Sequence, residues 1–488
     1  MNKMCIRDLA ELLGGRLQLG AMPPLGGDLE PLGRIVVDCR QIQAGDVFWA
    51  TMRDGQAADH AEEAFARGAL GVVAGRRVEP WAGKFALEVP DACSALDSLL
   101  NAARNRFSGR LVVVTGDSGK TTAAHWIHAA LRQHASGSLL PSTPLTPWPL
   151  TLLDLNVDRH YGVLEAPLEA ARIPCPAASL STPDAATTQA ATPQASTLRK
   201  LDFCRPDVIV VTSSDRNRAD EQCAELQAWL DAIGDGGMMI VNGDDALLSR
   251  FAAAAKLTLA DPNRIVTVGR GSHCDFTAVR VKFSDGCLSF DVEDRTVRIP
   301  AWGRHHLPAI LAAYCVARRM EVSPDDAWQS LSDCRTPTGA CQVVRTDRLT
   351  LVADSPRLRS NSARAALDLL RELEVPGRRI VVCGSLSTSQ RDESLDRWAG
   401  EIGEAIVTRC GADILVTVGS ECDRLLQAAR RAGMGESHLI ACLTPQDATE
   451  KLRALLAAGD AVLISGRDQE ELAELFAALT PLALTSAA

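Results

Sequence analysis

The sequence lacks the long apolar segments and the basic surface that would indicate a membrane or nucleic-acid protein. No apolar run approaches the length of a membrane span, and the first residues contain no apolar stretch typical of a signal peptide. The net charge is −10 and no block of like charge is present, which argues against the counterion release on which nucleic-acid binding depends. These absences favour a cytoplasmic protein.

Paired cysteines are also missing. The chain has 15 cysteines, an odd number, and none of them form a C-x-x-C pair. A disulfide framework and a zinc site built on cysteine pairs are therefore not indicated. We expect most of these cysteines to be small buried hydrophobic residues in a reducing compartment.

The length and composition indicate a soluble chain of several domains. A chain of 488 residues is too long for one core, and two to four domains are expected. Apolar residues make up 46% and charged residues 23%, as in globular proteins. No solenoid repeat is present.

Alternating apolar runs and helical patterns predict three α/β units. The expected bounds are 1–105, 106–335 and 336–488. In the first two units, strands are expected at 34–37, 47–51, 70–74, 111–115, 161–164, 208–212 and 239–242, and helices at 59–67, 121–133 and 307–319. The third unit repeats strand and helix with short loops, which is typical of a parallel, Rossmann-like sheet. Its strands are expected at 350–352, 379–383, 414–418 and 461–464, and its helices at 362–373, 393–410, 422–432 and 469–479.

One segment departs from this pattern. Residues 174–197 are built almost wholly of Ala, Ser, Thr, Pro and Gln. Such a composition buries too little apolar surface to order itself, and we interpret the segment as a surface insertion.

The most informative motif follows the apolar run that ends at Val114. It predicts a phosphate-binding loop between a strand and a helix, because backbone N–H groups, the helix N-terminus and a lysine would converge on one anion. Glycine at two positions would allow the turn and the close approach of phosphate. The expected nucleotide-binding residues are Gly116, Asp117, Ser118, Gly119, Lys120, Thr121 and Thr122. The general P-loop spacing would also place a glycine at 114.

The order of the units and several local strings resemble the Mur ligases. The family's loop is shorter than the general P-loop, which accounts for Val114. The resemblance is also carried by residues 38–40, 45–48, 59–60, 68–69, 242–245, 303–306 and 459–467. It implies an α/β fold with three domains: an N-terminal unit that binds a UDP substrate, a central P-loop unit and a Rossmann-like C-terminal unit.

The resemblance further implies an ATP- and Mg²⁺-dependent amide ligase of peptidoglycan precursor synthesis. Its substrates would be a UDP-muramoyl-peptide carboxylate and an amine such as D-Ala-D-Ala, joined through an acyl phosphate. Nucleic-acid partners are not expected, and contacts with other cell-wall enzymes are one option. The alternative is a catalytically impaired pseudoenzyme that binds nucleotide and acts as a scaffold or regulator.

This alternative arises because the chain departs from the family at chemically important positions. No histidine lies between His160 and His273 and no lysine between Lys200 and Lys256, where the family has ligands for a second Mg²⁺. Asp215 in this stretch could replace one ligand or could simply form a turn. Ala309 stands where the family places an asparagine against adenine. Ser465 replaces a lysine.

The resemblance assigns roles to individual residues in the central unit. Lys120 would contact phosphate, and Thr121 and Glu165 would bind Mg²⁺, with Lys120 and Glu165 as the catalytic pair. Thr121 could instead only cap the helix, and Glu165 could be an exposed loop residue. His305 would lie near the nucleotide. His306 is expected to be a surface or capping residue.

Three further residues are expected to bind substrate. Cys39 and Arg40 match positions that hold the UDP moiety, although an arginine at a strand end is often simply salt-bridged. Asp354 would orient the incoming amine or backbone amides in the third unit. It could equally be a turn-forming residue before Ser-Pro.

Overall fold

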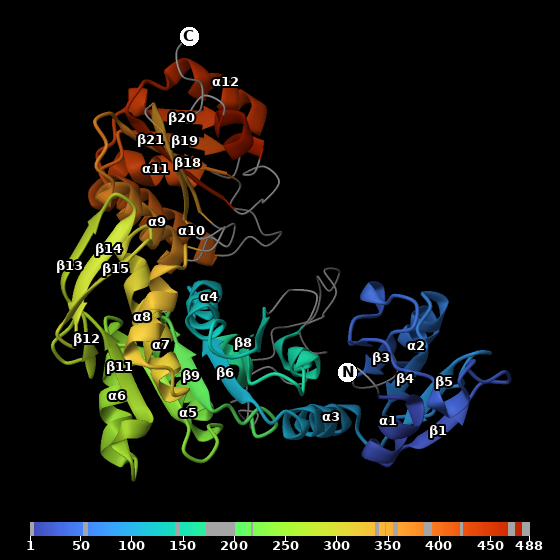
Figure 1. Cartoon of the computed structure of the whole chain (residues 1–488). Coiled ribbons are helices and arrows are strands. Elements are labelled where there is room, and N and C mark those ends of the chain that lie inside the picture. Colours follow the sequence, from blue (N-terminus) through green and yellow to red (C-terminus); the bar gives the residue numbers. More distant parts are fainter. Residues whose placement is uncertain are drawn as a thin grey trace.

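The computed structural model places the N-terminal and C-terminal sheets at opposite ends of the molecule, with the central sheet between them (Figure 1). It describes residues 4–51, 57–141, 147–171, 201–215, 218–336, 341–346, 348–354, 360–384, 393–419, 423–466 and 474–480. The predicted insertion at 174–197 lies outside these residues.

The N-terminal sheet has five strands in the order β1-β5-β4-β3-β2. Strands β2 to β5 pair in parallel, whereas β1 is antiparallel to β5. The strands are β1 (Arg16–Leu19), β2 (Ile35–Val36), β3 (Val47–Ala50), β4 (Gly71–Ala74) and β5 (Phe85–Glu88). The helices are α1 (Ile6–Leu13) and α2 (Ala57–Ala66), with short turns η1 (Gly27–Leu29) and η2 (Cys39–Gln41). The three strands and the helix predicted here are confirmed, with their ends shifted by a residue or two.

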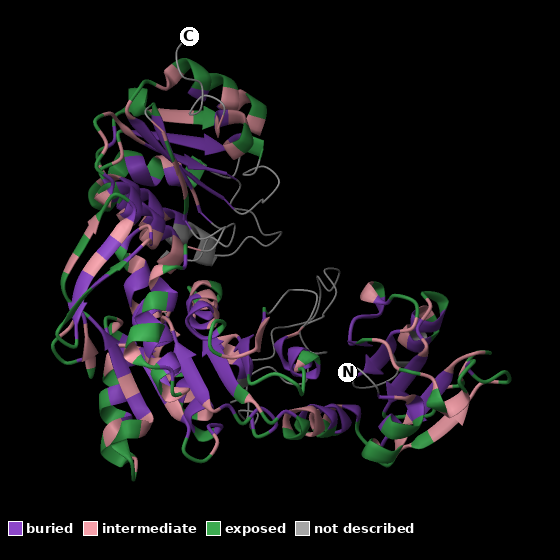
Figure 2. Ribbon diagram, in the orientation of Figure 1, coloured by how far each residue is buried: buried purple, intermediate pink, exposed green. Residues whose placement is uncertain are grey.

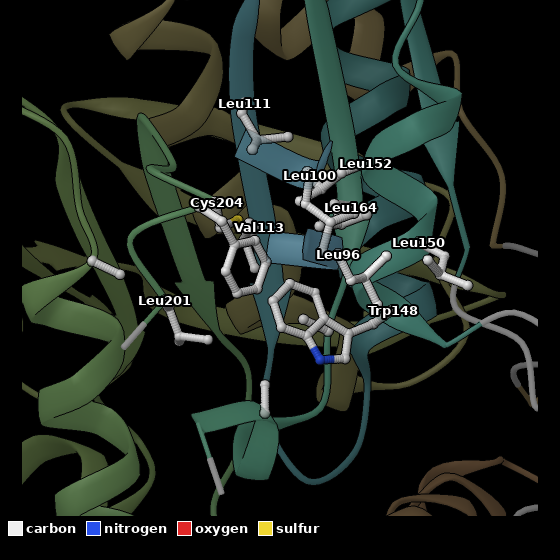
Figure 3. Packing of buried hydrophobic residues seen from close by; sticks show 14 of the residues in the cluster. Leu96, Leu100, Leu111, Val113, Trp148, Leu150, Leu152, Leu164, Leu201 and Cys204 are labelled. Carbon is white, nitrogen blue, oxygen red and sulfur yellow. The ribbon is translucent and has the colours of Figure 1, made fainter. Parts of the chain in front are cut away.

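Helix α3 (Ala92–Arg106) connects this sheet to the central one. The helix contacts both sheets. The Trp49 indole N–H donates to the backbone carbonyl oxygen of Ala92 at 2.7 Å, and the side chains of Leu96 and Leu100 are buried with Leu111 in a shared apolar cluster (Figure 3). The sequence analysis did not predict α3.

The central sheet has seven strands, all parallel, in the order β12-β11-β10-β9-β6-β8-β7. The strands are β6 (Arg110–Thr115), β7 (Gly137–Leu140), β8 (Tyr161–Glu165), β9 (Val208–Val211), β10 (Met238–Asn242), β11 (Ile265–Gly269) and β12 (Phe276–Thr277). The helices are α4 (Lys120–Leu131), α5 (Ala219–Asp231), α6 (Ala246–Thr258), α7 (Leu307–Arg319) and α8 (Pro324–Ser332). Short helices are η3 (Trp148–Asp154), η4 (Leu168–Ala171), η7 (Pro262–Arg264) and η8 (Arg304–His306). Each element predicted for this unit is present. The five inner strands are mostly buried (Figure 2), whereas the edge strands β7 and β12 are largely half-buried, as expected for a parallel sheet covered on both faces.

A small antiparallel sheet follows, which was not predicted. It consists of β13 (Val279–Ser284), β14 (Cys287–Val292) and β15 (Arg295–Ile299). Asp285 and Gly286, with φ of 49° and 70°, make the first hairpin turn, and the Asp-Gly pair is the sequence signal for such a turn.

The C-terminal sheet has the order β16-β17-β21-β18-β19-β20 and is parallel except at β16. The strands are β16 (Gln342–Arg345), β17 (Leu349–Ala353), β18 (Arg379–Cys383), β19 (Ile414–Val418), β20 (Leu439–Cys442) and β21 (Asp460–Ser465). The helices are α9 (Ser360–Glu372), α10 (Glu393–Ala405), α11 (Asp423–Arg431) and α12 (Pro445–Leu455), with η11 at Glu436–His438. The predicted helix 393–410 is α10 followed by a π-helical turn, Ile406–Cys410, which ends at Gly411 in the left-handed region. The helix expected at 469–479 falls partly outside the described residues, and 474–480 are helical.

None of the helices within the described ranges combines the length and apolar character needed to cross a bilayer. The predicted unit bounds of 1–105, 106–335 and 336–488 remain a proposal.

Candidate nucleotide site

The loop between β6 and α4 has the backbone that its glycines predict. Gly116 and Gly119 have φ of 131° and 80°, in the region that favours glycine. A Cβ on Gly116 would lie 2.4 Å from Thr212 Oγ1. Gly116 therefore allows the segment after β9 to pack directly against the loop.

Not all amides of this loop point into one concavity, as the sequence analysis expected. The Asp117 N–H donates to the Ser213 carbonyl oxygen at 2.9 Å, and the Ser118 N–H donates to Ser213 Oγ at 2.9 Å. The close approach of the 212–213 segment is the reason. Helix α4 begins at Lys120, and the first N–H groups of a helix have no intrahelical acceptor, so this end of α4 is the candidate element for binding an anion.

Lys120 folds back over the loop. Its ammonium donates to the carbonyl oxygens of Gly116 at 2.7 Å and Asp117 at 3.1 Å. Lys120 is also one of the residues that line a cavity next to the loop. A full positive charge is thus held at the helix N-terminus, where it would meet a phosphate.

Thr121 and Glu165 come together from α4 and the end of β8. The Thr121 hydroxyl donates to Glu165 Oε2 at 2.9 Å. Glu165 is 4% exposed. The alternative that Glu165 is an exposed loop residue is therefore wrong. A hydroxyl and a carboxylate oxygen are the hard ligands that Mg²⁺ prefers, so this donor set fits that ion.

Thr121 borders a cavity of about 590 Å³ between the central and C-terminal sheets. Glu165 is not among the described residues that line this cavity and lies behind Thr121, to which it is hydrogen-bonded. Residues 117–122 of the loop line the cavity, including Thr122. The charged side chains in its wall are three cations and five carboxylates: Lys120, Arg270, Arg304, Asp117, Asp244, Asp354, Asp368 and Glu372. A polyphosphate would add further negative charge, so this wall favours binding together with a divalent cation.

One wall of the cavity is apolar. Pro308, Ala309 and Ala312 of α7 face it, together with Ile240 and Val268 from the sheet. Such a surface suits the flat face of a base. Ala309 offers no hydrogen-bonding group to that base, in contrast to the asparagine that the resemblance implies.

His305 also lines the cavity, but His306 is not a surface residue. Burial lowers the pKa of His305 to about 4, so this imidazole is neutral at neutral pH. His306 is 0% exposed and accepts a weak hydrogen bond from the Trp126 indole N–H at 3.5 Å. The expected surface position of His306 is therefore wrong. His306 is the N-cap residue of α7, but its side chain makes no capping hydrogen bond. Its ring packs against Trp126 and His305.

Among the polar wall residues that follow β16, Asp354 and Asn361 make hydrogen bonds that tie this part of the chain to its surroundings. Asp354, after β17, is buried in the wall of the cavity and accepts hydrogen bonds from the Ser362 hydroxyl at 3.3 Å and the Cys341 thiol at 3.7 Å. From α9, the Asn361 amide donates to the Ser214 carbonyl oxygen at 2.8 Å and to Asp117 Oδ2 at 3.3 Å. Asn361 thus links α9 to the phosphate loop.

The remaining predicted site residues lie elsewhere. Among the described residues, the cavity wall does not include Asp215, whose N–H donates to Gln222 Oε1 at 2.8 Å. Arg40 makes a two-point ion pair with Asp38, at 2.9 Å and 3.0 Å. Cys39 is buried beside His60 and Glu63, and burial together with the Glu63 carboxylate raises the pKa of its thiol to about 11.

Several residues of the cavity wall were not predicted from the sequence. Asn361, Arg270, Asp368 and Glu372 were not singled out, because they come from separate elements and form no motif. The spacing of Asp368 and Glu372, four residues apart on one helix, could have placed them on a common face.

Comparisons with known proteins agree with this arrangement. The model of the Mur ligase glutamate ligase domain matches residues 341–467. A UDP-N-acetylmuramoyl-tripeptide–D-alanyl-D-alanine ligase of Bacillus subtilis is 25% identical over 426 residues, covering 85% of this chain and 83% of that relative. The corresponding Escherichia coli enzyme is 23% identical over 458 residues, covering 89% and 90%. The chain is therefore similar to Mur ligases over most of its length, and residues 341–467 match a domain model of that family.

Solved structures of Mur ligases share the fold of this chain. MurF from Acinetobacter baumannii superposes with a TM-score of 0.72 at 19% identity, covering 97% of this chain and 98% of that one. MurF from Thermotoga maritima, solved in complex with ADP, gives a TM-score of 0.65 at 19% identity, covering 92% and 98%. The predicted α/β fold with three-domain Mur ligase architecture is confirmed.

Proposed function

We propose that this protein is an ATP-dependent amide ligase of peptidoglycan precursor synthesis. It would join the carboxylate of a UDP-muramoyl-peptide to the amine of D-Ala-D-Ala or a similar (di)peptide. The observation that carries the proposal is the cavity between the phosphate loop and the C-terminal sheet, which is lined by Lys120 and by Thr121, whose hydroxyl donates to Glu165. The names of the curated relatives support the substrate class.

The reaction has two steps. A carboxylate oxygen of the first substrate attacks the γ-phosphorus of ATP, which forms a C–O–P bond and breaks the P–O bond to ADP. The amine nitrogen then attacks the activated carbonyl carbon, releases inorganic phosphate and loses a proton. Both steps depend mainly on positioning and charge stabilisation.

Residues of the cavity suit this task. Lys120 would exchange its two carbonyl acceptors for phosphate oxygens. Thr121 and Glu165 would hold Mg²⁺, which supplies charge neutralisation on the phosphates when bound. The apolar wall around Ala309 would hold the base, with neutral His305 at its edge. Asp354 would orient the amine.

The N-terminal unit would bind substrate, and the reaction would have a defined cellular location. Cys39 and Arg40 would contribute to binding the UDP moiety, and the reaction would take place in the cytoplasm. Since the chain lacks the histidine and lysine that bind a second Mg²⁺ in the family, we expect slow turnover.

The test is an assay with purified protein, ATP, Mg²⁺, UDP-muramoyl-tripeptide and D-Ala-D-Ala, in which phosphate and amide product are both measured. Product is expected only when both substrates are present, and Lys120→Ala should abolish it. Lys282→Ala, which changes an exposed lysine on β13, is the matched control and should retain activity. Nucleotide binding without product would overturn the ligase proposal in favour of the scaffold alternative.

A further inference from the structure

A second cluster of chemically active side chains lies in the N-terminal unit, apart from the nucleotide cavity. Cys39 belongs to the short turn η2, and His60 and Glu63 lie three residues apart on α2. This i, i+3 spacing places the imidazole and the carboxylate on one face of the helix. Contacts between α2 and η2 bring the thiol to that face.

The three donor atoms are spaced as the ligands of a metal ion are. Cys39 Sγ lies 3.4 Å from His60 Nδ1 and 3.3 Å from Glu63 Oε2, and His60 Nδ1 lies 3.9 Å from Glu63 Oε2. Tetrahedral Zn²⁺, with bonds of about 2.3 Å to sulfur and about 2.0–2.2 Å to nitrogen or oxygen, separates its ligands by roughly 3.3–3.6 Å. An ion at the centre would require shifts of only a few tenths of an ångström.

Neighbouring residues hold the carboxylate in place. Arg67 donates to Glu63 Oε1 at 2.9 Å, which leaves Oε2 as the oxygen that faces Cys39 and His60. The other end of the Arg67 guanidinium reaches the Arg40 carbonyl oxygen at 3.5 Å. Such outer contacts orient metal ligands and are typical of protein metal sites.

The burial of the cluster also suits an ion. Cys39 is 5% exposed, whereas the side chains of His60 and Glu63 are 31% and 39% exposed. A cation can therefore enter from solvent along the helix face and bind the thiol at the base of the site. Three protein ligands leave a fourth position open to water or another exogenous ligand.

We propose that Cys39, His60 and Glu63 form a binding site for a single thiophilic divalent cation, of which Zn²⁺ is the best match. The mixed sulfur, nitrogen and oxygen ligand set excludes Mg²⁺ and Ca²⁺, which take oxygen ligands. Binding forms a bond from the cation to the Cys39 thiolate, and the thiol proton leaves to solvent. No C-x-x-C pair marks such a site in the sequence, because only one cysteine takes part.

The test uses the full-length chain, stripped with a chelator and titrated with Zn²⁺ alone in competition with a chromophoric chelator. One ion per chain is expected to bind tightly. Cys39→Ser and, separately, His60→Gln should weaken binding by about 10–100-fold or more. Cys93→Ser, a cysteine of α3 in the same unit, is the matched control and should leave the affinity unchanged. Because no ATP or substrate is present, the result is independent of the proposed ligase activity.

Cobalt provides a second readout. With Co²⁺ in place of Zn²⁺, the wild-type chain and Cys93→Ser should show a thiolate-to-cobalt charge-transfer band, and Cys39→Ser should not. His60→Gln changes a part-exposed side chain, so its loss of binding with an unchanged circular dichroism spectrum separates ligation from folding. Absence of stoichiometric binding would overturn the proposal. So would equal binding by Cys39→Ser, which would indicate adventitious binding at other cysteines.

Discussion

At the residue scale, Ala309 places no hydrogen-bonding side chain in the wall that we propose holds the base of the nucleotide. A site that hydrogen-bonds a substrate rejects analogues strongly because its own polar groups would be left unpaired, whereas an apolar wall discriminates weakly. The chain should therefore bind ATP and GTP with affinities within about tenfold of each other. Ala309→Asn should shift the preference toward ATP, which competition binding with the two nucleotides would measure. A wild-type chain with strong preference for ATP would contradict this reading.

Glu165 should control the dependence of turnover on Mg²⁺. Glu165→Gln keeps the size of the side chain but removes the charge, and we expect about 10²–10³-fold slower phosphate release. Glu165→Asp should retain part of the activity at raised Mg²⁺. Glu169→Gln, on the neighbouring η4, serves as the control. Equal Mg²⁺ titrations for wild type and Glu165→Gln would rule out a metal role for this carboxylate.

The paired histidines His305 and His306 should make the folded state sensitive to acid. Burial lowers the pKa of His305 to about 4 and that of His306 well below its ordinary value of 6.5. Between pH 6.5 and 4 the unfolded chain therefore binds protons that the folded chain does not, and stability falls as the pH falls. Thermal unfolding followed from pH 7 to pH 5 should show this loss.

The double change His305→Gln with His306→Gln provides the matching comparison. Even if it lowers the melting temperature at pH 7, the slope of melting temperature against pH should become flatter. An unchanged slope would assign the acid sensitivity to other groups.

At the scale of elements, α9 joins the C-terminal sheet to the phosphate loop through Asn361. Removing the two hydrogen bonds with Asn361→Ala should weaken nucleotide binding by roughly 2–10-fold, the effect of one to two ordinary hydrogen bonds. Arg371→Ala, near the other end of α9, removes a contact to the Arg409 carbonyl oxygen and is the control. Calorimetric titration with a nonhydrolysable ATP analogue would compare them. Equal affinities would show that the Asn361 contact does not contribute.

Elements with strong apolar runs could be predicted from the sequence, whereas those specified by turns or shared packing could not. Strand β18 and helix α7 have the expected bounds, since each combines a regular apolar pattern with clear flanking signals. The β13–β15 sheet was missed although Asp285-Gly286 marks its first turn. In the cavity wall, the motif predicted the phosphate loop, and the resemblance to the Mur ligases placed His305, Ala309 and Asp354. Asn361 and Arg270 reach the cavity because the fold brings distant segments together.

At the scale of the whole molecule, α3 couples the N-terminal and central sheets. Leu100 is 0% exposed and lies in the cluster with Leu111 and Trp148 (Figure 3). Leu100→Ala should destabilise the chain by about 2–5 kcal/mol, measured by denaturant unfolding. Ser98→Ala, at an exposed position of the same helix, should change stability by less than about 0.5 kcal/mol. If the chain unfolded in two separate transitions and Leu100→Ala lowered the stability in only one of them, the proposed coupling of the two sheets would be contradicted.

The shared cluster around α3 also limits how evolution and engineering can recombine this protein. A graft that replaced residues 1–105 with the corresponding piece of a distant relative would bring foreign side chains to the positions of Leu96 and Leu100, against an unchanged Leu111. The N-terminal piece is therefore not a freely exchangeable module, and chimaeras should be viable only when the helix and its partners in the central sheet are transferred as one block.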